Sequence, residues 1–157
     1  MLSKLNRGVV NALKQDGKYG ETRDGMDVAL CLIDMEHNTI DFAGANRPLY
    51  IVRNKEIKVY NGDKRPIGGY DDVSQPYTTN HINMEKGDRY YMFSDGYADQ
   101  FGGPNNKKFL IKNLQRLLIE IAQLDFQTQY QKLSESQKSW KGSNEQTDDV
   151  LVIGFKM

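Results

Sequence analysis

The sequence predicts an α+β fold in which mostly antiparallel strands come first and a pair of helices follows. Between residues 26 and 94, apolar residues recur in short runs bounded by glycine, proline and asparagine, which is typical of strands. After Pro104 the apolar spacing changes to three and four residues, which is typical of amphipathic helices. A last apolar run at 150–155 predicts a closing strand. Strands, then helices, then a strand favour two packed layers over alternating parallel βαβ units.

Composition excludes several classes of protein. The chain has 157 residues, with 21 Lys and Arg against 21 Asp and Glu, so its net charge is zero. Nucleic-acid-binding proteins usually carry a basic excess, so we expect no nucleic-acid partner. Its apolar runs are far shorter than a membrane span, and its start does not resemble a signal peptide. Together with the single cysteine, Cys31, this predicts a cytoplasmic location, although a parent protein could be anchored through other domains.

The first part of the chain predicts a helix and two strands. Leu2, Leu5, Val9 and Leu13 have helical spacing, so residues 2–15 should form an amphipathic helix lying on a sheet, with a loop at Gly17 and Gly20 after it. The run at 26–33 is almost wholly apolar, which predicts a central strand covered on both faces. Cys31, within it, should pack as a small apolar residue. A turn and a strand at 39–43 follow.

The middle of the chain predicts a hairpin and two further strands. Strands at 49–53 and 56–60 flank Asn54 and Lys55, a pair suited to a tight turn. Residues 61–69 form a glycine-rich loop whose Lys64 and Arg65 could grip a phosphate, although a solvated loop is the simpler interpretation. Strands are expected at 75–82 and 88–94.

Residues 107–140 should be helical on one outer face. The leucine and isoleucine stripe at 110–124 predicts one helix, and we interpret it as core. A more polar helix should follow from about 125 to 140, anchored by Trp140 and capped at Gly142.

Two acidic residues are candidate metal ligands. Asp95 stands at the end of the strand at 88–94, and Asp148 precedes the strand at 150–155. If these strands are neighbours, the two carboxylates converge on one point, and hard oxygen ligands suit Mg²⁺ or Mn²⁺. An acid after a strand is often only a turn former, which is the alternative for Asp95 alone. Asp149 is interpreted as a supporting or strand-start residue, with direct contact to the metal as the open alternative. Asp99 is interpreted as a cap of the turn, with an approach to the site as its alternative.

Five short motifs, in this order, carry a family resemblance. They are DGMDVAL at 24–30, AGANRPL at 43–49, RPIG at 65–68, FSDG at 93–96 and QTDDV at 146–150. The sequence resembles the C-terminal portion of the SpoIIE-like branch of PPM-type metal-dependent serine/threonine protein phosphatases. The resemblance implies an antiparallel β-sandwich flanked by helices, with a two-metal site at one end. It also implies that Asp95 and Asp148 are catalytic residues and ligands of Mn²⁺ or Mg²⁺.

The family pattern also includes a segment that this sequence lacks. That segment lies upstream and supplies an aspartate that bridges both metals, within a stretch containing Gly-His-Gly; neither His37 nor His81 lies in such a context. We therefore expect residues 1–157 to form a single partial domain, without its N-terminal part. Such a fragment should be inactive alone and bind metal poorly. A bare sheet edge or face would also allow the fragment to self-associate.

The resemblance further implies a mechanism and partners. Two divalent cations activate a water that attacks phosphoserine or phosphothreonine. The substrate would be a phosphorylated protein, for example an anti-sigma-factor antagonist, and the parent would be a bacterial signalling protein with an N-terminal sensor or regulatory part.

Two alternatives remain open. Asp34 follows an apolar strand, as does the nucleophile of haloacid-dehalogenase-type phosphatases, but Glu36 stands where that family needs an aspartate and no parallel βαβ pattern follows. The other alternative is a catalytically inactive phosphatase fold used as a binding or regulatory module.

Overall fold

The computed structural model describes residues 1–15, 24–69 and 74–157. The described residues form two compact units, one of Met1–Leu49 with Val59–Lys86 and one of Tyr50–Lys58 with Gly87–Met157. The loop predicted at Gly17 and Gly20 lies outside the described residues. None of the helices in the described ranges is long and apolar enough to cross a membrane.

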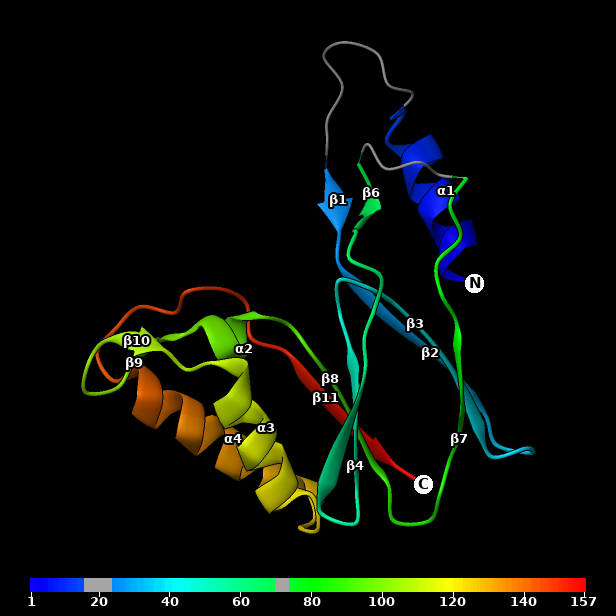
Figure 1. Cartoon of the computed structure of the whole chain (residues 1–157). Helices are drawn as coiled ribbons and strands as arrows, with labels where there is room; N and C mark the ends of the chain where they lie inside the picture. The colour runs from blue at the N-terminus through cyan, green and yellow to red at the C-terminus, as the bar shows by residue number, and fades with distance from the viewer. Residues whose placement is uncertain (16–23, 70–73) are drawn as a thin grey trace. The chain divides into compact units, whose positions relative to one another are not determined.

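The first unit contains a three-stranded antiparallel sheet and a helix (Figure 1). Strand β3 (Thr39–Ala45) lies between β2 (Val28–Asp34) and β7 (Asn80–Asn83). A short pair, β1 (Gly25–Met26) and β6 (Ile67–Gly68), forms a separate antiparallel ribbon. Helix α1 (Leu2–Ala12) packs against β6, as the amphipathic spacing at 2–15 predicts.

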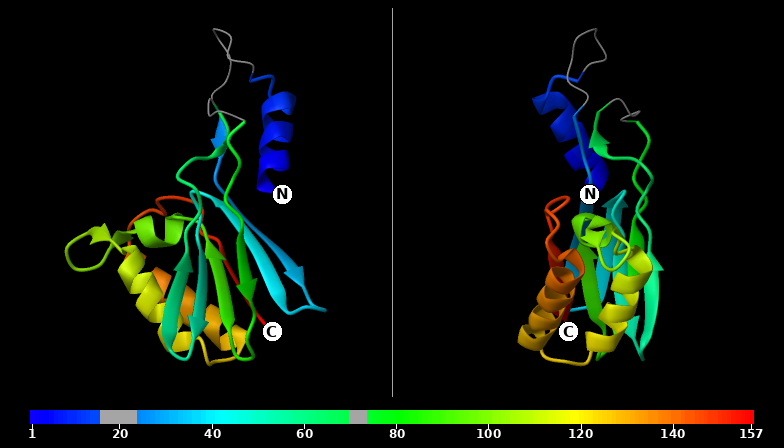
Figure 2. Two further views of the ribbon diagram at one scale, coloured as in Figure 1. Left: turned by 45° about the vertical axis from the view of Figure 1, so that its right-hand side comes forward. Right: turned by 90° about the vertical axis from the view of Figure 1, so that its left-hand side faces the viewer.

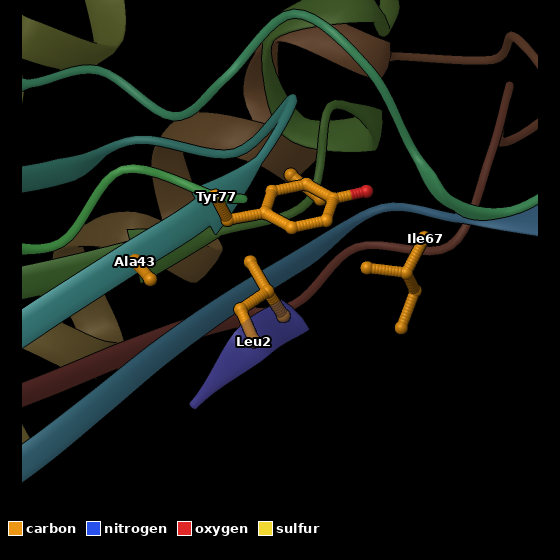
Figure 3. Packing of buried hydrophobic residues seen from close by; sticks show 5 residues of the cluster. Leu2, Ala43, Ile67 and Tyr77 are labelled. Carbon is orange, nitrogen blue, oxygen red and sulfur yellow. The ribbon is translucent and has the colours of Figure 1, made fainter. Parts of the chain in front are cut away.

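The apolar cluster of this unit joins the helix to the sheet (Figure 3). It consists of Leu2, Ala43, Ala45, Ile67 and Tyr77, all less than 10% exposed. Asn6, buried on the same helix, accepts a hydrogen bond from the Gly68 amide at 2.7 Å. Burying apolar surface and satisfying this amide together hold α1 against the unit.

Two strand predictions in this unit are wrong in part. β2 is an edge strand of the described sheet, and Leu32 and Ile33 are 52% and 40% exposed, so the central strand is β3. A run of apolar residues indicates a strand but does not fix its neighbours. The strand predicted at 75–82 is shorter in the structure, where it is β7. Before it, the Tyr77 and Thr78 amides donate to the side chains of Ser3 and Asp63 and not to a neighbouring strand.

The second sheet is antiparallel where β8 pairs with its neighbours, with the order β11 (Val152–Lys156), β8 (Arg89–Phe93), β4 (Leu49–Arg53) and β5 (Glu56–Tyr60). The turn between β4 and β5 has positive φ at both Asn54 (51°) and Lys55 (65°). Positive φ at both central residues defines the tight hairpin turn that suits twisted strands. The predicted hairpin is therefore confirmed, together with the closing strand.

Helices α3 (Ile111–Ile121) and α4 (Phe126–Lys141) run side by side along this sheet (Figures 1 and 2). Tyr50 and Tyr91 lie opposite each other on one face of the sheet. The Tyr50 hydroxyl accepts from Gln115 of α3, and the Tyr91 hydroxyl donates to Gln129 of α4. The helices therefore cover this face, and the period change after Pro104 identifies them correctly.

The segment between β8 and α3 contains short elements that the sequence does not predict. They are α2 (Gly96–Asp99), β9 (Phe101–Gly102) and β10 (Lys107–Lys108), so residues 107–110 are not helical. Trp140 anchors α4 here, as expected: its indole N–H donates to the Gln100 carbonyl at 3.0 Å, and its ring packs on Phe109. Gly142, with φ 55°, ends the helix as the predicted cap.

Candidate metal site

Asp95 lies directly beyond the end of β8. Ser94 follows the last strand residue, and Asp95 precedes the four-residue helix α2, whose Asp99 amide donates to the Asp95 carbonyl at 2.9 Å. Asp95 is partly exposed and lies at the rim of the sheet. A strand end fixes the backbone of an acid while leaving its side chain accessible, which is what a ligand position needs.

Asp148 lies four residues before β11 and is exposed. One of its carboxylate oxygens, Oδ1, accepts a hydrogen bond from the Asp149 amide at 2.6 Å. The Gln146 carboxamide donates to the Asp148 carbonyl at 2.8 Å. These short-range bonds restrict both the backbone and the side chain of Asp148.

The structure brings the two acid-bearing segments side by side. The Ser94 amide donates to the Leu151 carbonyl at 3.0 Å, and the Ser94 hydroxyl donates to the Asp149 carbonyl at 2.7 Å. The same hydroxyl accepts from the Leu151 amide at 2.9 Å. These bonds continue the pairing of β8 with β11 beyond both strands.

Gly96 shows how closely the segments approach. A Cβ atom at this position would lie 2.4 Å from the Asp149 carbonyl oxygen and 3.0 Å from that of Asp148. Only glycine, which has no side chain, fits such an approach. The residue after Asp95 therefore abuts the backbone of Asp148 itself.

The donor set fits part of a metal site. Two aspartates on adjacent segments supply the hard oxygen ligands that Mg²⁺ and Mn²⁺ prefer. Across the described ranges, however, three or more histidine, cysteine or acidic side chains do not gather where they could hold an ion. Asp95 and Asp148 would therefore supply some of the ligands of such an ion and leave the others to water or to residues elsewhere.

The neighbouring acids have other partners. Asp99 is the last residue of α2, and its carboxylate forms an exposed ion pair with Lys108 at 2.9 Å, so it does not cap this helix, whose N-cap is Asp95. Asp149 is exposed, and its contribution to the arrangement above is its carbonyl, which accepts from Ser94. The interpretation of Asp149 as a supporting residue stays a prediction.

The two basic residues of the loop at 61–69 have different surroundings. Lys64 is exposed, whereas the Arg65 guanidinium donates to the Gln75 carbonyl at 2.7 Å and lies 4.1 Å above the Tyr77 ring. Arg65 therefore ties this loop to residues 75–77, so the solvated-loop interpretation fits Lys64 and not Arg65.

Asp34 is engaged in a turn. It accepts bonds from the amides of Glu36 and His37 and from the His37 ring, and these hydrogen bonds, those from His37 first, lower the pKa of its carboxyl. The strand it ends pairs antiparallel with β3. Both findings count against a dehalogenase-type nucleophile, which needs a parallel sheet.

Sequence reasoning missed two polar clusters. One joins Asp27 to Asn46 and Arg47, each at 2.8 Å, and Asn46 has a positive φ of 57°. The other is centred on Gln100, which is fully buried. Asparagine often adopts a positive φ, so Asn46 in AGANRPL hints at an unusual backbone, but a glutamine in a loop carries no comparable signal.

Comparison with known proteins agrees with this fold. The family model described as Stage II sporulation protein E (SpoIIE) matches residues 1–157. No curated protein sequence matches the chain.

Among solved structures, the chain is similar to the SiaA-PP2C domain of Pseudomonas aeruginosa, with a TM-score of 0.88, 22% identity, and 99% of this chain and 59% of that chain covered. It is similar to the phosphatase domain of the cell fate determinant SpoIIE from Bacillus subtilis, described as Mn presoaked (TM-score 0.66, 18% identity, 99% and 63% covered). It is also similar to the serine/threonine phosphatase PstP/Ppp of Mycobacterium tuberculosis (TM-score 0.61, 14% identity, 95% and 66% covered). The chain therefore spans less than two thirds of the length of these three solved chains.

Proposed function

The chain belongs to the SpoIIE family of PP2C-type serine/threonine phosphatase domains, and from this premise we propose that it contributes Asp95 and Asp148 to a metal-dependent phosphatase site. The observation that carries the proposal is the side-by-side arrangement of the Asp95 and Asp148 segments, joined through Ser94 and closely packed at Gly96.

The chemistry of the two acids supports this role. Mn²⁺ or Mg²⁺, when bound, would lower the pKa of a water and offset negative charge on the phosphoryl group. Asp95 and Asp148 would hold and orient the ions from two rigidly paired segments. No cysteine nucleophile is needed, and burial raises the pKa of the Cys31 thiol to about 11, which opposes thiolate chemistry at neutral pH.

Membership of the family supports a proposal for the biological role. We propose that the substrate is a phosphoserine or phosphothreonine of another protein, for example an anti-sigma-factor antagonist, and that the reaction serves cytoplasmic bacterial signalling. A sensor or regulatory part would belong to the parent protein. Comparing the phosphoproteomes of the parent strain and a deletion strain tests this: a phosphoserine or phosphothreonine site should rise in the deletion strain, and an unchanged phosphoproteome contradicts the role.

The catalytic assignment has its own test. In the full-length protein, Asp95→Ala and Asp148→Ala should each abolish Mn²⁺-dependent hydrolysis of a phosphopeptide and change the melting temperature little, because both side chains lie at a partly or fully exposed rim. Asp99→Ala, which removes an exposed ion pair, is the matched control and should retain activity. Loss of folding in Asp95→Ala, or full activity in either variant, would overturn the assignment.

One observation favours a second candidate. Because the described residues present only a partial ligand set, the chain could act as a phosphatase-fold binding or regulatory module without turnover. That alternative predicts that a phosphopeptide binds equally well to the unaltered protein and to Asp148→Ala, with no release of phosphate from either.

A further inference from the structure

Gln100 is a buried carboxamide that the ligand assignment does not use. It is 0% exposed and stands between α2 and β9. Its Nε2 group donates to the Glu145 carbonyl at 2.9 Å and to the Phe101 carbonyl at 3.0 Å, and its Oε1 accepts from the Thr147 amide at 3.3 Å. Both hydrogen-bonding ends of one side chain are thus directed at the residues that lead into Asp148.

The backbone of Gln100 is itself held firmly. Its carbonyl accepts from the Phe109 amide at 2.9 Å and from the Trp140 indole at 3.0 Å. A Cβ at the nearby Gly102 would lie 1.8 Å from the Trp140 carbonyl, so the chain here is packed directly on α4. Gln100 therefore joins a rigid support to the segment at 145–147.

Ser94 holds the other side of the same segment. Its hydroxyl donates to the Asp149 carbonyl and accepts from the Leu151 amide. Asp148 consequently lies between two anchors, Gln100 before it and Ser94 after it, and both anchors belong to the stretch that carries Asp95. One short stretch thus fixes the backbone on both sides of the partner acid.

We propose that Gln100 and Ser94 are positioning residues that fix Asp148 relative to Asp95 for metal binding. This inference rests on the proposed function. An exposed loop acid must lose backbone freedom when it binds an ion, and anchors already in place reduce that entropic cost. Residues that orient metal ligands typically change affinity by about 10- to 100-fold when they are replaced.

The test is a Mn²⁺ titration of the ¹⁵N-labelled chain, followed by paramagnetic broadening of amide signals. In the unaltered chain, amides at 94–97 and 147–149 should broaden together at the same Mn²⁺ concentration. In Gln100→Met, broadening at 147–149 should need about 10-fold more Mn²⁺, and the Thr147 amide should exchange faster with solvent.

Gln129→Met is the matched control. Gln129 is also buried, at 2% exposed, and also uses both ends of its carboxamide, toward Tyr91 and the carbonyls of Ala122 and Leu124. It should lower stability as Gln100→Met does and leave the Mn²⁺ titration unchanged. An equal loss of Mn²⁺ affinity in both variants would overturn the inference, because loss of stability alone would then explain it.

Ser94 provides a second variant that does not depend on a buried carboxamide. Ser94→Ala should weaken Mn²⁺ broadening at 147–149, and Ser94→Thr, which keeps the hydroxyl, should restore it. Unaltered titrations in both Gln100→Met and Ser94→Ala would overturn the inference and leave the metal site standing. If the unaltered chain shows no selective broadening at either segment even when Mn²⁺ is raised above about 1 mM, the weak-binding limit expected for the chain alone, the metal site itself is wrong and the inference falls with it.

Discussion

Asp88 is the most deeply buried acid among the described residues, and its partners explain how it is tolerated. It is 1% exposed, and its two carboxylate oxygens accept from Arg53 Nε and a terminal Arg53 nitrogen, each at 2.7 Å. The Tyr90 hydroxyl donates to the same carboxylate at 2.7 Å. A buried charge is costly unless it is paired and hydrogen-bonded, and here both conditions are met.

Removing this carboxylate should destabilise the protein. Asp88→Ala removes the carboxylate that pairs with the Arg53 charge and accepts from the Tyr90 hydroxyl. We therefore expect the free energy of unfolding to fall by about 3 kcal/mol in urea titrations. Arg53 is 33% exposed, which places the effect at the lower end of the range for buried pairs. Lys108→Ala, which breaks an exposed pair, should cost less than about 1 kcal/mol. Equal losses in the two variants would contradict this account.

Cys31 should react slowly in the folded protein. Burial raises the pKa of its thiol from 9.0 to about 11, so at pH 8 its thiolate fraction is about 100-fold lower than in the unfolded chain. Alkylation by iodoacetamide should accelerate about tenfold per pH unit up to pH 11. Because the unfolded thiol ionises first, this group also reduces stability as pH rises from 9 towards 11. A rate that levels off near pH 9 in the folded protein would contradict the shift.

At the scale of elements, apolar periodicity predicted the long helices and most strands. The stripe at 110–124 locates α3 because its buried residues, Leu114, Leu118 and Ile121, recur at three and four positions. Short elements escaped prediction for a physical reason. α2, β9 and β10 hold only two to four residues each, and contacts distant in sequence, such as those of Trp140 and Gln100, determine them.

For the candidate site, the sequence predicted the strands that bring its two acids near each other, and their role as metal ligands stays a prediction. Asp95 and Asp148 stand beside strands that do pair, so their segments meet as expected. Sequence could not reveal the anchors, because a buried glutamine such as Gln100 is recognised only when its partners are known. It also could not decide that β2 is an edge strand, since pairing order depends on the whole fold.

Replacing two glycines by alanine should change the stability of the protein in opposite directions. Gly8 lies within α1, where an added Cβ would meet no atom within 4 Å, so Gly8→Ala should raise the free energy of unfolding by about 0.5–1 kcal/mol. The backbone of Gly44 lies close to that of Gly62, and a Cβ added at Gly44 would lie 2.1 Å from the Arg47 carbonyl oxygen. Gly44→Ala should therefore displace the AGANRPL loop and lower the melting temperature. Thermal unfolding of the two variants checks both signs, and destabilisation by Gly8→Ala would contradict the first.

At the scale of the whole molecule, β11 presents an unusual edge. It is an edge strand of its described sheet; its residue Ile153 is 44% exposed, and Leu151, just before the strand, is 56% exposed. A cavity of about 480 Å³ lies beside it, lined partly by Phe126 and Tyr130 of α4. An unpaired strand edge next to exposed apolar surface favours pairing with another chain.

We therefore expect the 157-residue chain to self-associate through β11. Sedimentation velocity should show a mass that rises with concentration, and Ile153→Lys should suppress that rise, because a charge on an edge strand opposes pairing. Leu32→Lys places the same charge on β2, the edge of the other sheet, and serves as the control. Suppression by Leu32→Lys alone would assign association to β2 instead.

The last expectation concerns metal binding by the chain alone. Asp95 and Asp148 supply two carboxylates, and Mg²⁺ and Mn²⁺ keep their water shell unless several charged oxygens converge. Two ions held this way would also repel each other with little negative charge between them. Calorimetry should therefore give a Mn²⁺ dissociation constant above about 1 mM, equivalent to less than about 4 kcal/mol. Hydrolysis of p-nitrophenyl phosphate should be absent.

A form extended upstream by the segment that the family resemblance implies should bind Mn²⁺ more tightly and gain activity. Mn²⁺-dependent turnover by the 157-residue chain that disappears in Asp148→Ala would overturn this expectation, because two aspartates would then suffice.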